Sequence, residues 1–195
     1  FITPNETIRV GASAYVLDPA TFPAAAALKN NAVLGRLTVS SIDGDIDGDG
    51  DFDRIQAYGA RSFTIWDEAG NRIFDSADAI ERITAGQVPA LFNSDGAADS
   101  FDSRSDNKGP EPESVAIGTI GGRPYAFIGL ERVGGILTYD LSNPLRPELV
   151  SYSNPAAGAP GSPGQGDLAP EGLLFIPAGD SPTGKDLLVS GNEGS

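Results

Sequence analysis

The amino-acid sequence predicts an all-β fold, and within that class a β-propeller of which the chain supplies about three blades, with short helices in insertions. One observation is composition: 25 Gly and 15 Pro among 195 residues suit many short strands joined by tight turns. The other is a repeat of strand-like runs near the period of propeller blades, which are commonly about 40–50 residues long. A β-sandwich is the alternative. Since a complete propeller needs about four blades, the remaining blades of a longer protein, or other copies of this chain, would complete it.

The repeat is marked by a Pro-Glu step before a pair of strand-like runs and a Gly-x-Glu step after them. Pro112-Glu113 precedes the first pair, which ends in Gly129-Leu130-Glu131. Pro170-Glu171 precedes the second pair, before Gly191-Asn192-Glu193. The Pro-Glu steps lie 58 residues apart (171 − 113) and the Gly-x-Glu steps 62 (193 − 131). The similar separations predict two units of one structural type.

These marks divide a single propeller fragment, 1–195, into consecutive parts. They are an N-terminal segment (1–35), a blade-like unit with an acidic loop (36–92), a long loop (93–112), a second blade-like unit (113–152), a Pro/Gly-rich insertion (153–169) and a partial blade (170–195). In the first blade-like unit we expect strands at 36–42, 55–58, 62–66 and 72–74 and a helix at 76–86. Later strands are expected at 114–118, 125–130, 135–139, 173–176 and 186–190.

Charge and missing residue types exclude several functions. The chain has 13 Lys and Arg against 27 Asp and Glu, a net charge of −14, so nucleic acid and anionic lipid are poor partners and cations are good ones. No apolar run approaches the roughly 18 residues that span a bilayer. The chain has no His and no Cys, which excludes a Ser–His–Asp triad and imidazole or thiolate metal sites within it. It starts at Phe1 without Met, and we expect a processed fragment of a secreted or cell-surface protein.

The acidic loop at 45–53 predicts a calcium site. Carboxylates stand at every second position, and the sixth position is Gly50, which permits a sharp turn. The expected ligands are Asp45, Asp47, Asp49, Asp51 (through its backbone carbonyl) and Asp53. Gln56 occupies the twelfth position, where a helix–loop–helix calcium site has a bidentate Glu, and strands rather than helices are expected on both sides. We therefore expect structural calcium in a hairpin loop; the alternative is a solvated acidic turn, which would repel itself without a cation.

The repeated glutamates are candidates for a second metal or channel site. Glu113, Glu131, Glu171 and Glu193 recur at equivalent places, and in a propeller such positions can point into the central channel. Several carboxylates converging there would need a cation or a basic group. Glutamates that close turns between blades are an equally good interpretation.

Three cations are candidates for anion binding. Arg104 and Lys108 lie in the long loop and Arg132 follows the strand at 125–130. A phosphorylated small molecule held between them and a channel metal is one interpretation. A salt-bridged surface loop is the commoner arrangement.

Taken together, five stretches of the chain resemble the bacterial choice-of-anchor I secreted proteins. They are 49–67, 104–113, 125–135, 170–172 and 192–195, and the resemblance covers about residues 33–195. It implies export, a larger parent protein and a β-propeller loosely related to phytase-like esterases and to alkaline phosphatases that use propeller-bound calcium. It does not fix an activity, because a fold can carry many functions.

Two functions therefore stand. The first is a non-enzymatic, calcium-stabilised extracellular module for attachment or assembly, in keeping with the lack of any nucleophile motif. The alternative is a calcium-dependent phosphoester hydrolase of the phytase or phosphatase type, with metal at the repeated glutamates and the three cations holding phosphate. The sequence leaves open whether the protein is an enzyme.

Overall fold

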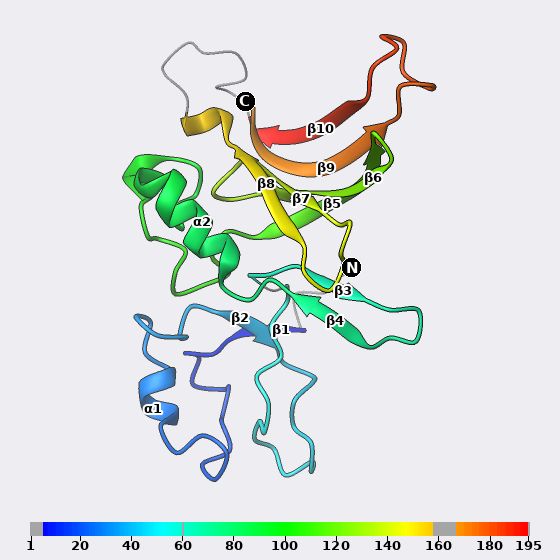
Figure 1. The fold of residues 1–195 in the computed structure, drawn as a ribbon. Helices are drawn as coiled ribbons and strands as arrows, with labels where there is room; N and C mark the ends of the chain where they lie inside the picture. Colours follow the sequence, from blue (N-terminus) through cyan, green and yellow to red (C-terminus); the bar gives the residue numbers. More distant parts are fainter. Residues whose placement is uncertain (1–5, 60, 158–166, 195) are drawn as a thin grey trace. The chain divides into compact units, whose positions relative to one another are not determined.

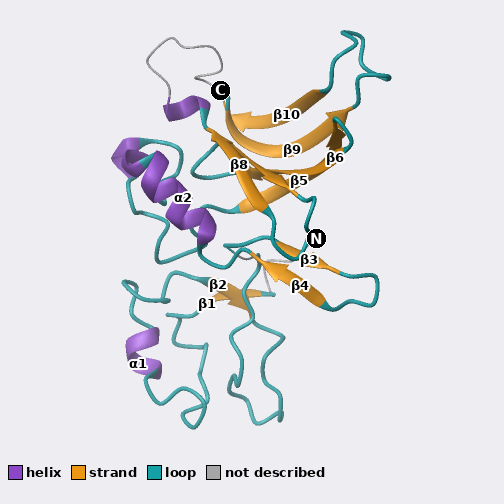
Figure 2. Cartoon of the chain, in the orientation of Figure 1, coloured by secondary structure: helices purple, strands orange, loops and turns teal. Residues whose placement is uncertain are grey.

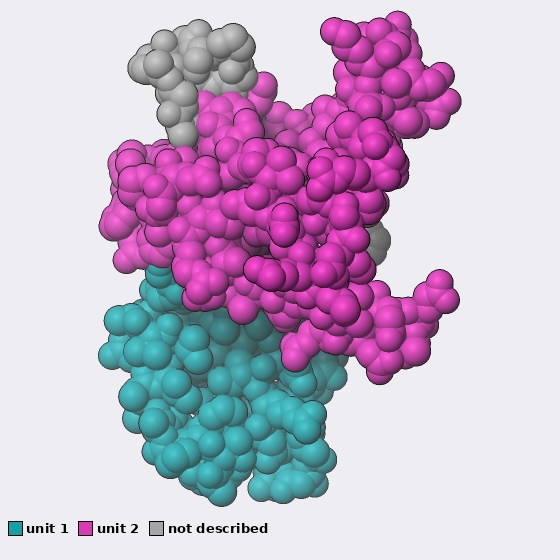
Figure 3. Space-filling view, viewed as in Figure 1, with its two compact units in different colours: residues 1–60, 105–108 teal, residues 61–104, 109–195 magenta. Residues whose placement is uncertain are grey.

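The computed structural model describes residues 6–59, 61–157 and 167–194. The chain divides into two compact units (Figure 3), the first formed by 1–60 with 105–108 and the second by 61–104 with 109–195. This boundary falls inside the segment 36–92 that the sequence groups as one blade-like unit.

Strands dominate the regular structure (Figures 1 and 2), so the all-β class is confirmed. The strands are β1 (Thr7–Arg9), β2 (Thr38–Ser40), β3 (Thr64–Trp66), β4 (Arg72–Asp75), β5 (Pro112–Ile120), β6 (Arg123–Leu130), β7 (Ile136–Asp140), β8 (Glu148–Ser153), β9 (Leu168–Ile176) and β10 (Leu187–Gly194). The helices are α1 (Ala25–Leu28) and α2 (Ala79–Gln87), with 3-10 turns η1 (Pro89–Leu91), η2 (Ala98–Ser100) and η3 (Pro155–Ala157). Among the described residues no sheet closes into a barrel or a propeller, so the propeller stays a prediction.

The first unit is built on the antiparallel pair β1–β2 and a small apolar core. Val10, Tyr15, Leu17 and Val39 are the buried residues of this core. The prediction of a strand at 55–58 is wrong: within this segment only Ala57 forms an isolated antiparallel β-bridge, with Val39. Pairing does not continue, because the chain turns away at Gly59, whose φ is +78°.

The second unit centres on an antiparallel sheet of strand order β5-β6-β7-β8. Gly121 and Gly122, both with positive φ, form the two-residue turn between β5 and β6, as such hairpins require. Strand side chains alternate between faces. One face packs Ile128 and Leu137 against Ile80 of α2.

The opposite face of this sheet is covered by the β9–β10 hairpin, also antiparallel. Phe127 of β6 stacks on Phe175 of β9 with ring centroids 5.7 Å apart. Gly118 allows this approach, since a Cβ there would lie 2.5 Å from the Phe175 ring. Helix α2, the four-stranded sheet and the β9–β10 hairpin thus form three layers of the second unit, which also contains the antiparallel β3–β4 hairpin.

Candidate functional site

The acidic loop gathers three of its five aspartates. Carboxylate oxygens of Asp45, Asp47 and Asp49 lie within 4.8 Å of one another. Each oxygen ligand lies about 2.3–2.6 Å from a calcium ion, so two oxygens on opposite sides of the ion are separated by about twice that length, which is close to 4.8 Å. The donor set therefore fits calcium in type and spacing. Gly50 turns the loop with a φ of +100°, as its sixth position predicts.

Asp51 and Asp53 lie outside this group of three. Asp53 accepts a hydrogen bond from the backbone N–H of Ile46 at 2.7 Å, which ties the end of the loop to its beginning. The side chain of Asp51 is half-buried. Burial, followed by the charge of Asp49, raises its pKa.

Negative charge accumulates in the loop. The neighbouring Asp49 carboxylate raises the pKa of Asp47, with smaller effects from burial and from Asp53 and Asp45. Backbone N–H groups offset part of this: Asp45 accepts from Gly48 at 2.7 Å and from Gly50 at 3.1 Å. Backbone amides of the loop thus hold its shape, but its carboxylates still repel one another. A bound cation would relieve this repulsion.

The loop is anchored in the core of the first unit through Phe52. Its ring stacks on the buried Tyr15 with centroids 4.2 Å apart. Its backbone N–H donates to Val16 and its carbonyl accepts from Asp18. At the other end, Ser40 donates from its N–H to the carbonyl of Gln56. Order in the acidic loop is therefore coupled to the packing of this unit.

A second acidic cluster lies in the second unit and brings the repeated glutamates together. Oxygens of Glu111, Glu113 and Glu131 lie within 4.8 Å of one another, and so do oxygens of Glu131, Glu171 and Glu193. Glu131 belongs to both groups. Its side chain is buried, as is that of Glu111, whereas the other three glutamates are exposed.

The positions of these glutamates follow from two equivalent β-bulges. In β5–β6, Pro112 pairs with Leu130 and Ser114 with Gly129, so Glu113 is the extra residue. In β9–β10, Pro170 pairs with Asn192 and Gly172 with Gly191, so Glu171 is the extra residue. A bulge re-aims the side chain at that point.

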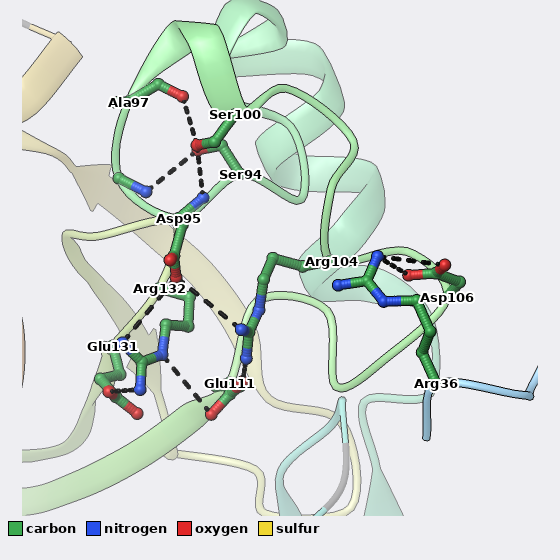
Figure 4. Close-up of polar contacts among 11 residues, drawn as sticks. Arg36, Ser94, Asp95, Ala97, Ser100, Arg104, Asp106, Glu111, Glu131 and Arg132 are labelled. Atoms are coloured by element: carbon green, nitrogen blue, oxygen red, sulfur yellow. Dashed lines mark hydrogen bonds and ion pairs between the residues drawn. The ribbon is translucent and has the colours of Figure 1, made fainter. Parts of the chain in front are cut away.

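Two arginines neutralise the buried carboxylates (Figure 4). Arg104 forms an ion pair with Glu111, and Arg132 pairs with Glu131 at 2.5 Å. Arg132 also lies 3.9 Å from Glu111, and both arginines lie 3.8 Å from Asp95. An anion would have to compete with these carboxylates for the guanidinium groups. Lys108, the third cation of that prediction, belongs to the first unit.

Sequence reasoning missed Glu111 and Asp95. Glu111 is 3% exposed and has a φ of +49°. Its backbone carbonyl accepts a hydrogen bond from the Glu131 N–H at 2.9 Å, which holds the two glutamates together. Its equivalent in the second hairpin, Ala169, has a φ of +55° before Pro170. A glutamate on each side of Pro112 was the available signal; nothing in the sequence marks Asp95.

The family comparison agrees with the earlier resemblance. The choice-of-anchor I domain matches residues 3–144, nearly three quarters of the chain. The chain belongs to the choice-of-anchor I domain family. The match begins at residue 3, before the resembling stretch 33–195, and ends at residue 144, before the end of that stretch.

Two curated relatives are animal proteins. Gigasin-3a of Magallana gigas is 36% identical over 176 residues, which are 83% of this chain and 62% of that protein. Mesenchyme-specific cell surface glycoprotein of Strongylocentrotus purpuratus is 36% identical over 80 residues, 35% of this chain and 10% of that protein. The chain thus matches about three fifths of the first relative and a tenth of the second. No solved structure matches.

These comparisons indicate an extracellular or cell-surface module. They do not confirm the bacterial origin, because both relatives come from animals. None of the helices in the described ranges has the length and apolar character that crossing a membrane requires.

Proposed function

We propose that this choice-of-anchor I module binds calcium in its acidic loop and serves attachment or assembly outside the cell. The observation that carries the proposal is the convergence of Asp45, Asp47 and Asp49 around a turn made by Gly50. Hard oxygen ligands in this spacing suit calcium.

Calcium in this loop would act on structure rather than on a substrate. The loop is tied to the core of the first unit by the stacking of Phe52 on Tyr15. A cation that relieves the repulsion between Asp47 and Asp49 would therefore stabilise that unit. A rigid extracellular module with a fixed surface is suited to attachment.

Calorimetric titration of the chelator-treated chain with calcium tests the proposal. We expect one site that Asp47→Ala/Asp49→Ala removes. The control is Asp78→Ala/Asp180→Ala, which changes the net charge equally at exposed positions outside both acidic clusters. No binding by the parent chain, or equal binding by the loop variant, would overturn the proposal.

A second candidate function is phosphoester hydrolysis at the glutamate cluster. The observation favouring it is the shared Glu131, which joins two carboxylate groups and pairs with Arg132. Calcium held there by Glu113, Glu171 and Glu193 would polarise a phosphate, while Arg132 would bind it in place of its carboxylate partners.

This candidate has its own test. Hydrolysis of p-nitrophenyl phosphate should be abolished by chelation and by Glu171→Gln/Glu193→Gln. A calcium site that survives Asp47→Ala/Asp49→Ala in calorimetry would support it. Turnover that persists in chelator would exclude it.

We also propose that the parent fold is a β-propeller. Its support is the four-stranded meander β5–β8, the form of a propeller blade, and the equivalent bulges in two hairpins packed face to face. A solved structure of a full-length relative would test it by its blade number.

A further inference from the structure

An apolar groove in the second unit is separate from the acidic loop. It has a volume of about 530 Å³ and runs between β3 and the first half of β5. Ala126 and Ile128 contribute to its lining. A volume of this size falls in the range of ligand pockets, about 300–1,000 Å³.

Large apolar side chains line this groove and remain open to solvent. Trp66 is 59% exposed, Val115 64% and Ile117 59%. Val115 and Ile117 share one face of β5, whereas the alternating residues Ala116 and Gly118 are buried on the face toward β9. Exposed apolar side chains gathered in one groove are typical of interaction sites.

Both strands that border the groove are edge strands within the described residues. There β5 pairs only with β6, and β3 only with β4. An edge presents backbone N–H and C=O groups that can pair with an added strand. Val115 and Ile117, two positions apart, would contact alternate side chains of such a strand.

Charge identifies the kind of strand that fits. Glu113 lines the groove and is exposed at its bulge, and the whole chain carries a net charge of −14. A lysine or arginine near Glu113 would be favoured, and an acidic segment would be repelled.

We propose that this groove binds an extended, basic segment of a partner protein as a strand added to β5. Apolar side chains of that segment pack on Trp66, Val115 and Ile117, and a basic side chain pairs with Glu113. The inference builds on the proposed attachment role and names its partner class, but uses none of the calcium loop. Pairing of β5 with β5 of a second copy is disfavoured, because both copies carry the same large negative charge.

Trp66 is the only tryptophan of the chain, so its fluorescence reports directly on the groove. The probe is the acetylated peptide Lys-Val-Thr-Val-Thr-Lys, and its matched control is Glu-Val-Thr-Val-Thr-Glu. We expect a saturable blue shift of Trp66 emission with the basic peptide that weakens with salt. The acidic peptide should give none.

Variants locate the binding on β5. Ile117→Lys should weaken binding at least tenfold, and Val115→Thr, a milder change, several-fold. Val189→Lys is the matched control: Val189 is 46% exposed on the β9–β10 hairpin, outside the groove, and its variant should bind like the parent. Thermal melts check that each variant folds.

Three outcomes would overturn the proposal: no shift with the basic peptide, equal responses to both peptides, or equal affinity of parent and Ile117→Lys. Sedimentation that shows a dimer lost in Ile117→Lys would assign the groove to self-association instead. Calcium titration of Ile117→Lys distinguishes this proposal from the calcium proposal. If only peptide binding is lost, calcium binding at the acidic loop should be unchanged.

Discussion

Glu113 and Glu171 are the extra residues of two β-bulges that stand at the same register in hairpins β5–β6 and β9–β10. The residue that pairs with each preceding proline is followed by a glutamate, Glu131 in one hairpin and Glu193 in the other. The sequence repeat is therefore a repeat of backbone geometry. It explains why the four repeated glutamates, up to 80 positions apart (193 − 113), belong to one acidic cluster.

The two hairpins nevertheless differ in how tightly they pack. A Cβ on Gly129 would lie 2.2 Å from Ser114 Oγ and 3.0 Å from the Pro170 carbonyl, whereas Gly191, its equivalent, has nothing within 4 Å. Gly129→Ala should lower the free energy of unfolding by about 1–3 kcal/mol, and Gly191→Ala should not lower it. Denaturant unfolding followed by circular dichroism measures both. Equal effects would show that the contact between hairpins contributes nothing specific.

The ion pair between Arg104 and Glu111 should be costly to break. Removing the guanidinium takes this ion pair from a carboxylate that is 3% exposed, while Arg132 lies 3.9 Å from it. Arg104→Ala should lower the free energy of unfolding by about 3 kcal/mol. Arg82→Ala removes an exposed pair with Asp78 and should change it by less than about 1 kcal/mol. Urea titration compares the two, and a similar small effect for both would contradict the buried role.

Several features could be predicted because they depend on local sequence. Gly50 at the sixth loop position predicts the sharp turn, and the turn is found there. Apolar runs predict strands β5, β6 and β7 within a few residues. The spacing of Ala79, Ile80 and Ile83 predicts α2. Each depends on periodicity or on one backbone conformation, which neighbouring residues specify.

Other features could not be predicted, because distant residues decide them. Strand β8 has four exposed residues in succession, Glu148 to Ser151, and forms because β7 offers an edge. At 55–58 the residues are strand-like, yet the three-residue β2 gives them a single bridge. The cluster around Glu111 includes Asp95, which lies in a separate irregular loop and is 3.8 Å from both Arg104 and Arg132. No local feature of the sequence indicates that the segment 36–92 is divided between the two units.

Asp140 should make stability depend on pH in the acid range. The Ser142 hydroxyl and N–H, and then Arg123, hold the pKa of this buried carboxyl below its ordinary value of 3.8. A lowered folded-state pKa contributes stability above about 3.8, and this contribution disappears as the pH falls through the folded-state value. The melting temperature of Asp140→Asn should therefore lie below that of the parent at pH 7, and the gap should narrow below pH 3.8. A gap that is constant from pH 7 to pH 2 would contradict this.

Calcium should raise the melting temperature of the chain through the acidic loop. Binding to the folded state alone stabilises it by about 2.7 kcal/mol at a hundredfold excess over Kd. Gly50→Ala should reduce this gain, because a φ of +100° strains any side chain by about 1–3 kcal/mol and moves the carboxylates apart. Gly86→Ala, at an exposed position in α2 with nothing within 4 Å of a new Cβ, should instead stabilise the chain by about 0.5–1 kcal/mol and keep the full calcium response. Differential scanning calorimetry of the three chains, with calcium and with chelator, measures these shifts. A melting temperature unchanged by chelator in the parent chain would refute the structural role of calcium, because a tightly bound ligand of the folded state cannot be removed without loss of stability.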